Sequence, residues 1–105
     1  MEQFDILYNK NKSSKNDVPY LINLQSDPMN ILATTVVAPL RKTSKYSEQI
    51  LTKLHIPITI NNIDYTIFTS ELASIPTNII GDKVLNANYL RQDCTEAIDL
   101  LFTGF

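Results

Sequence analysis

The fold of this chain is decided by the stretch Ile56-Pro57-Ile58-Thr59-Ile60-Asn61-Asn62-Ile63-Asp64-Tyr65-Thr66-Ile67-Phe68-Thr69. It consists of two runs of alternating side chains on either side of a pair of Asn residues. Asn tolerates a positive φ, which a tight turn between antiparallel strands requires. The stretch therefore predicts a β-hairpin with strands at 56–60 and 63–69. Pro57 lacks a backbone N–H, so its strand lies at the edge of a sheet or begins there.

The segments before this hairpin also alternate as strands do. At residues 4–8 and 20–24 the even-numbered positions are apolar, which predicts two strands with these side chains on one face. Residues 35–38 form a short β-branched run, which we expect Pro39 to end. Polar connections are predicted as loops at 9–17, 27–30 and 41–47.

The end of the chain changes to a helical period. One face of a 3.6-residue helix carries Leu90, Cys94, Ala97, Ile98, Leu101 and Phe105. The opposite face carries Gln92, Glu96, Asp99 and Thr103. Asn86 or Asn88 suits the start of this helix and Gly104 its end. An apolar helix that runs into the chain terminus is either fixed in its own core or offered to a partner.

Length and composition describe an ordinary small globular protein. The 105 residues predict one domain, 1–105, with a real core. The net charge of −2 gives no argument for nucleic-acid binding. We find neither a signal peptide nor a run of transmembrane length, and Cys94 is the single cysteine. We therefore expect a soluble, cytoplasmic protein without membrane contact.

Several short motifs, taken in order, resemble one family. They are Gln25-Ser26-Asp27, Val36-Val37-Ala38-Pro39-Leu40, Leu72-Ala73-Ser74-Ile75-Pro76, Ile80-Gly81 and the ending Ala97-Ile98 to Gly104-Phe105. Their order, spacing and chain length resemble those of CcdB toxins from Phe4 to Phe105. Each motif is common alone, whereas the joint order is specific.

The resemblance implies a mainly β fold, an SH3-like small β-barrel with a C-terminal α-helix, which forms a homodimer. It implies the toxin of a bacterial toxin–antitoxin pair, used in plasmid maintenance, that binds the DNA gyrase A subunit and traps the cleaved-DNA complex. It implies neutralisation by a CcdA-like antitoxin, which represses the operon together with the toxin, so that operator DNA is bound only with the antitoxin. It implies no catalytic residue, cofactor or metal.

The same resemblance assigns gyrase contacts to Pro28, Met29, Asp99, Phe102, Thr103, Gly104 and Phe105. The best-known members carry Trp where this chain has Thr103, and an arginine of gyrase stacks on that indole. Thr103 cannot supply this cation–π contact, which is worth on the order of 0.5–2 kcal/mol. Pro28 also stiffens a loop that is otherwise more flexible.

Six of the nine basic residues fall in two short segments: Lys10, Lys12, Lys15, Arg41, Lys42 and Lys45. Charges on loops are common, and solvated loops are the plainer interpretation. The functional interpretation is a cationic rim for an acidic antitoxin segment that folds as it binds.

Signals for catalysis are weak. His55 has no metal-ligand partner at a suitable spacing, and Cys94 falls on the buried stripe, where it serves as a small apolar residue. One alternative is an endoribonuclease of the MazF/Kid type, which resembles CcdB in fold and would use Arg41, Thr69 and His55. Another is an inactive relative that still binds antitoxin.

Overall fold

The computed structural model describes residues 1–27 and 31–104. Its strands are β1 (Asp5–Asn9), β2 (Tyr20–Asn23), β3 (Thr34–Lys42), β4 (His55–Ile60), β5 (Ile63–Phe68), β6 (Ala73–Pro76) and β7 (Ile80–Asn86). Its helices are α1 (Thr43–Tyr46) and α2 (Arg91–Thr103), with 3-10 turns η2 (Ser47–Gln49), η3 (Thr69–Glu71), η4 (Thr77–Ile79) and η5 (Asn88–Leu90).

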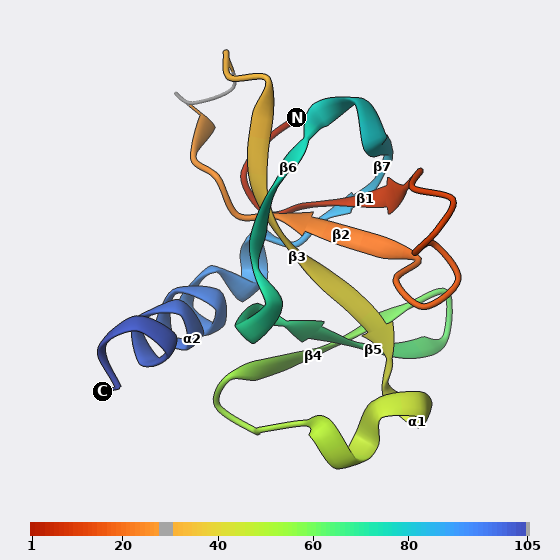
Figure 1. Cartoon of the computed structure of the whole chain (residues 1–105). Helices are drawn as coiled ribbons and strands as arrows, with labels where there is room; N and C mark the ends of the chain where they lie inside the picture. The colour runs from red at the N-terminus through yellow and green to blue at the C-terminus, as the bar shows by residue number, and fades with distance from the viewer. Residues whose placement is uncertain (28–30, 105) are drawn as a thin grey trace.

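The strands form one antiparallel sheet in the order β4-β5-β3-β2-β1-β7, and β6 also pairs with β3. The sheet curls into a half-closed barrel, and α2 projects from one side with the chain end at its outer tip (Figure 1). The prediction of a mainly β, SH3-like fold with a C-terminal helix is confirmed.

The central hairpin forms as predicted. Strands β4 and β5 pair from His55↔Phe68 to Ile60↔Ile63, and the turn residues Asn61 and Asn62 have φ values of 51° and 65°. Among the described strands β4 pairs only with β5, so Pro57 does lie on an edge strand. A proline there cannot donate a hydrogen bond to an added strand, which protects the edge.

The expectation that Pro39 ends its strand is wrong. Strand β3 continues to Lys42 because it changes partners along one side: β6 pairs with residues 34–37 and β5 with residues 40–42. Neither strand pairs with residues 38 and 39 on that side, so the missing N–H of Pro39 interrupts no ladder there.

The predicted alternation in 4–8 and 20–24 is only half correct. Ile6 and Ile22 lie in the main core, but Tyr8 is 48% exposed and the odd-numbered Leu7 and Leu21 are buried. Both faces of these strands are covered, because Leu21 packs with Val18 and Val37 in a second, smaller cluster. An alternating pattern predicts one solvated face, and these strands lack one.

Helix α2 packs as its pattern predicts. Cys94 and Ala97 are fully buried against the main core, with Leu90 and Ile98 beside them. The predicted Asn caps are wrong, since α2 starts at Arg91 and Leu90 stands at the cap without a side-chain bond. The Asn86 side chain instead accepts from the backbone of Asn88 in the preceding turn.

The hairpin turn gives the first testable prediction. Asn62→Val places a β-branched residue at φ 65°, which should lower the free energy of unfolding by about 1–2 kcal/mol. The control Asn62→Gly should leave stability unchanged or raise it, because Asn-Gly suits this turn. Urea denaturation measures both, and equal stability of the two variants would contradict the assigned turn.

Candidate functional site

The end of α2 is exposed rather than fixed in the core. Phe102 is 70% exposed, and Thr103 and Gly104 are exposed as well. Gly104 ends the helix at φ 81°, where its N–H donates to the Leu100 carbonyl. A Cβ at Gly104 would meet nothing within 4 Å, so glycine is needed here for its positive φ and not for lack of space. The open space beside it is available to a partner.

The predicted gyrase-contact residues fall into two groups. Asp99, Phe102, Thr103 and Gly104 share the exposed end of α2, and the Thr103 hydroxyl donates to the Asp99 carbonyl at 2.6 Å. Pro28, Met29 and Phe105 lie outside the described residues. The described part of the prediction is therefore brought together on one surface by the helix itself.

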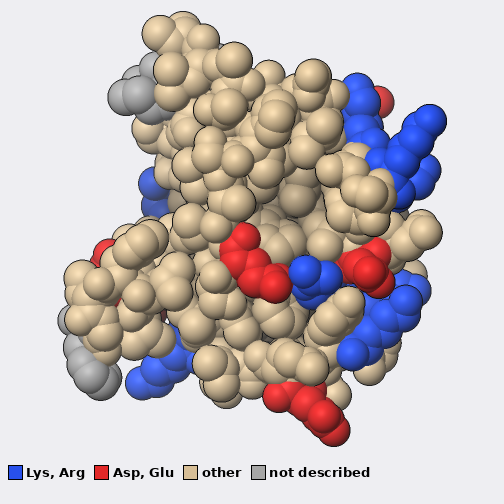
Figure 2. All heavy atoms as spheres, in the orientation of Figure 1, with Lys and Arg blue, Asp and Glu red and all other residues tan. Residues whose placement is uncertain are grey.

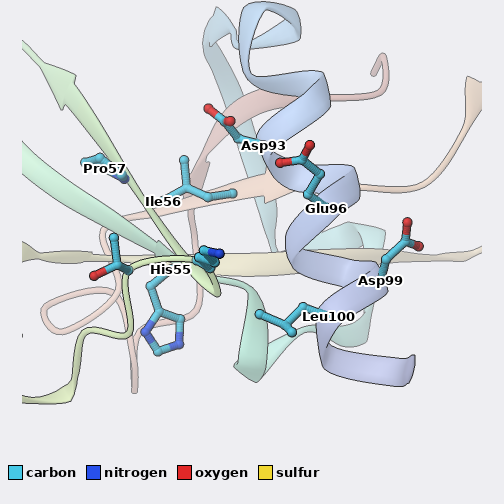
Figure 3. A pocket seen from close by; sticks show the side chains of 9 residues that line it. His55, Ile56, Pro57, Asp93, Glu96, Asp99 and Leu100 are labelled. Atoms are coloured by element: carbon cyan, nitrogen blue, oxygen red, sulfur yellow. The ribbon is translucent and has the colours of Figure 1, made fainter. Parts of the chain in front are cut away.

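A cleft of about 540 Å³ separates α2 from the start of β4. Its helix side carries Asp93, Glu96 and Asp99, and its other side includes Lys53 and Pro57. In Figure 3 Asp93 extends toward β4, whereas Asp99 points toward the outer side of the helix. No ion pair in the described part of the chain reaches these carboxylates, so the cleft presents a negative wall beside the exposed helix end.

The predicted antitoxin-contact residues occupy one end of the sheet. Lys10, Lys12 and Lys15 follow β1, whereas Arg41 and Lys42 end β3 and Lys45 lies in α1. The register Tyr8↔Tyr20 and Tyr20↔Leu40 aligns these ends. On the face seen in Figure 2 the basic side chains form separate groups with acidic side chains between them, so this face carries no continuous positive rim.

Arg41 differs from the lysines because it is held in place. The loop predicted at 41–47 contains the end of β3, α1 and the start of η2, and the Arg41 side chain is only 20% exposed. Its Nε donates to Glu71 Oε1 at 2.9 Å, and its guanidinium lies 5.0 Å from the Tyr46 ring centre. Burial is the largest single influence on the pKa of Arg41 and lowers it, but the hydrogen bonds and charges of Glu71 and Tyr46 together outweigh burial and raise the pKa, so the guanidinium stays charged.

His55 is a satisfied core residue, as its isolation in the sequence suggests. It is 4% exposed, and the centre of its ring lies 4.4 Å from the centre of the Phe68 ring. Its Nδ1 accepts from the Leu51 N–H at 3.1 Å, and its Nε2 lies 2.8 Å from Ser70 Oγ. Burial lowers the pKa of His55, and the nearby Glu71 carboxylate and Gln49 carbonyl only partly oppose this.

The three residues that an endoribonuclease would use do not all line one cavity. Arg41 and His55 line one cavity, but the hydroxyl of the fully buried Thr69 donates to the Leu54 carbonyl. Burial raises the pKa of the Cys94 thiol to about 11, which leaves it neutral and unreactive. No group of three or more His, Cys, Asp or Glu in the described ranges is arranged to hold a metal.

The sequence did not predict four of the residues that line this cavity: Tyr46, Gln49, Ser70 and Glu71. Glu71 lies 30 positions from its partner Arg41. The pairing of β3 with β5 brings η3 beside the end of β3, and only that strand order places the two side chains together. The sequence of the hairpin at 56–69 predicts how its two strands pair with each other, but not that β3 lies beside them. No local pattern therefore predicts the contact of Arg41 with Glu71.

A solved structure shares this fold. The chain is similar to the Mycobacterium tuberculosis toxin MazF-mt6, with a TM-score of 0.70 and 17% sequence identity. The match covers 93% of this chain and 95% of that one. At this identity the likeness defines the fold: a MazF-like curled sheet with a C-terminal helix.

The family follows from a second comparison. The profile of the CcdB protein family matches residues 3–104. The chain therefore belongs to the CcdB family, whose members are toxins of toxin–antitoxin systems, and the resemblance drawn from the sequence is confirmed. No helix in the described part of the chain is long and apolar enough to span a membrane.

The lowered pKa of His55 predicts a pH dependence of stability. The folded state holds fewer protons on this ring than the unfolded state, whose pKa is near 6.5. The contribution of His55 is therefore complete above about pH 6.5 and is lost as the pH falls through the lower, folded pKa. Thermal unfolding between pH 8 and pH 5 should show a steeper loss for the wild type than for His55→Gln. Parallel curves would contradict the assignment.

Proposed function

We propose that this protein is a toxin that binds the DNA gyrase A subunit and traps the cleaved-DNA complex, without catalysis of its own. The observation that carries the proposal is the exposed end of α2, where Phe102 is 70% exposed and Gly104 is open on its Cα side. An exposed aromatic beside an open backbone suits insertion into a partner, because the ring supplies apolar contact at little conformational cost.

We further propose a homodimer, as the family resemblance implies. A two-fold axis would bring two copies of the α2 end into one symmetric arrangement. A symmetric pair matches the symmetry of the gyrase A dimer. Membership of the CcdB family supports this pairing, and the exposed face of α2 leaves its end accessible in each copy.

The partner that neutralises the toxin is proposed to be a CcdA-like antitoxin with an acidic segment. The exposed lysines at the ends of β1 and β3 and Arg41 offer positive charge to that segment. The toxin and antitoxin together would bind operator DNA and repress their own transcription. Such a pair serves plasmid maintenance when a plasmid carries it.

RNA cleavage is the second candidate function, because Arg41 and His55 share one cavity in a MazF-like fold. The hydroxyl of Thr69 is bonded to the Leu54 carbonyl, and both ring nitrogens of His55 have partners. These contacts weigh against a free acid–base pair. An inactive relative, the third candidate, would bind antitoxin and leave gyrase supercoiling unchanged.

Truncation of the exposed ring tests the proposal. Phe102→Ala should weaken binding to the gyrase A subunit by at least about tenfold, because a central aromatic anchor is lost. Stability should change by less than about 1 kcal/mol, because the ring is 70% exposed. Calorimetric titration of the gyrase A subunit measures the affinity, and urea denaturation measures the stability.

The matched control is Tyr89→Ala. Tyr89 is 71% exposed, yet it precedes α2, whose 13 residues separate it from Phe102 by about 20 Å. Equal loss of gyrase binding in the two variants would remove the special role of the helix end. Strong destabilisation by Phe102→Ala would show that the ring belongs to the core.

The missing indole gives a separate prediction. Thr103→Trp should tighten gyrase binding by about twofold to thirtyfold, which corresponds to a cation–π energy of about 0.5–2 kcal/mol. Thr103→Val is the control, because it removes the hydroxyl bond to the Asp99 carbonyl without adding a ring. If Thr103→Trp and Thr103→Val bind alike, this chain does not place position 103 against an arginine.

A further inference from the structure

We infer that the cavity beside Arg41 is a carboxylate-binding site, in which an acidic side chain of a bound peptide replaces Glu71 as the partner of Arg41. The inference rests on the proposed function, since the acidic segment of the antitoxin is the ligand that would use it. It adds a defined pocket with Ser70, Tyr46 and Glu71, none of which is among the residues predicted to contact the antitoxin.

The cavity lies where the end of β3 meets α1 and the turn η3. Its volume is about 320 Å³, and Arg41, Tyr46, His55, Phe68, Ser70 and Glu71 form most of its lining. This volume exceeds that of one carboxylate. The pocket therefore accommodates an acidic side chain together with part of the backbone that carries it.

The walls of the cavity offer more hydrogen-bond donors than the protein uses. Arg41 has five N–H groups. Its Nε and Nη2 donate to Glu71 at 2.9 and 3.5 Å, and its Nη1 contacts the Tyr46 hydroxyl at 3.4 Å. Two guanidinium N–H groups and the hydroxyl hydrogen of Tyr46 have no acceptor among the described residues.

The hydroxyl of Ser70 is also available as a donor. The Leu51 N–H occupies Nδ1 of His55, so the ring proton of the neutral imidazole lies on Nε2 and is donated to Ser70 Oγ. Ser70 is exposed, and its own hydrogen is free to point at a ligand. This direction of donation also prevents His55 from taking a proton from Ser70, so the pair binds rather than reacts.

In the free protein the carboxylate of Glu71 occupies the place beside Arg41 that the ligand would take. Its carboxylate contacts the Arg41 guanidinium through one oxygen at 2.9 Å and the other at 3.5 Å, and its side chain is 44% exposed. The Glu71 side of this ion pair is open to solvent, where water can replace the guanidinium as its partner, so Glu71 can rotate away at small cost while Arg41 stays in place. An incoming carboxylate would gain the guanidinium together with the hydroxyls of Ser70 and Tyr46.

The charges favour a carboxylate over the phosphodiester of a nucleic acid. Glu71 remains near the cavity after it leaves Arg41, and the chain carries a net charge of −2. The free protein already seats a carboxylate beside the Arg41 guanidinium, with its two oxygens at 2.9 and 3.5 Å, so the donors are spaced for this group. Lys42 and Lys45 on the same end of the sheet can receive further acidic residues of the peptide.

The test is a titration of the ¹⁵N-labelled protein with an N-acetylated hexaglutamate peptide, followed by NMR at pH 7. The Arg41 Nε–H signal and the amides of residues 69–71 should shift together. Glu71→Gln should tighten binding by about threefold to tenfold, because the competing carboxylate is gone. Arg41→Gln should weaken binding at least about fivefold, and Ser70→Ala about twofold to fivefold.

The matched control is Glu48→Gln, which changes the net charge by the same amount. Glu48 is exposed in η2 and does not line the cavity. Its substitution should tighten binding by less than about twofold, because only long-range charge changes. The amide spectrum of each variant shows whether it remains folded, and Glu71→Gln keeps the test valid if Arg41→Gln does not fold.

Two outcomes would overturn the inference. The first is an equal effect of Glu71→Gln and Glu48→Gln, or shifts confined to Lys42 and Lys45. In that case the acidic antitoxin proposal stands and the pocket fails. The second is tighter binding of an octauridylate to the same signals, which would identify a phosphodiester site. If hexaglutamate shifts the signals of no basic residue, the proposal of an acidic antitoxin is itself contradicted. The gyrase experiments do not depend on any of these results.

Discussion

The structure depends on the contact of α2 with the main core through two small side chains. Cys94 and Ala97 are fully buried, and their size lets the helix backbone lie close to the sheet. The pKa of Cys94, raised to about 11, keeps the thiol neutral in this apolar contact. Because the buried apolar face of α2 does not include the last turn, Phe102 and Thr103 extend into solvent. Burial of one narrow face therefore produces the exposed terminus that the proposed function needs.

Local features of this fold could be predicted from the sequence, because short segments determine them. Asn61 and Asn62 gave the hairpin and its register, since two residues of positive φ allow one tight turn. The spacing of Cys94 and Ala97 gave the buried face of α2, and hence the exposed face with Asp99 and Thr103. The 3.6-residue period of α2 was therefore enough to predict which side chains of the helix end face solvent.

Features that depend on strand order could not be predicted. Pro39 resembles a strand end until β5 and β6 are seen to share β3 on either side of it. Leu21 resembles a solvent-facing residue until the second cluster with Val18 covers it. The pairing of Arg41 with Glu71 likewise needs η3 to lie beside the end of β3. The carboxylate pocket is a product of this assembly, at a different place from the α2 end.

We propose that this chain stalls gyrase rather than cutting nucleic acid itself. The most direct measurement incubates the purified protein with gyrase, supercoiled plasmid and ATP, and then denatures gyrase to release any trapped breaks as linear DNA. We expect linear DNA that rises with protein concentration and requires gyrase, and intact RNA when the protein is incubated with RNA alone. Absence of linear DNA above the gyrase background, or cleavage of that RNA, would contradict the proposal.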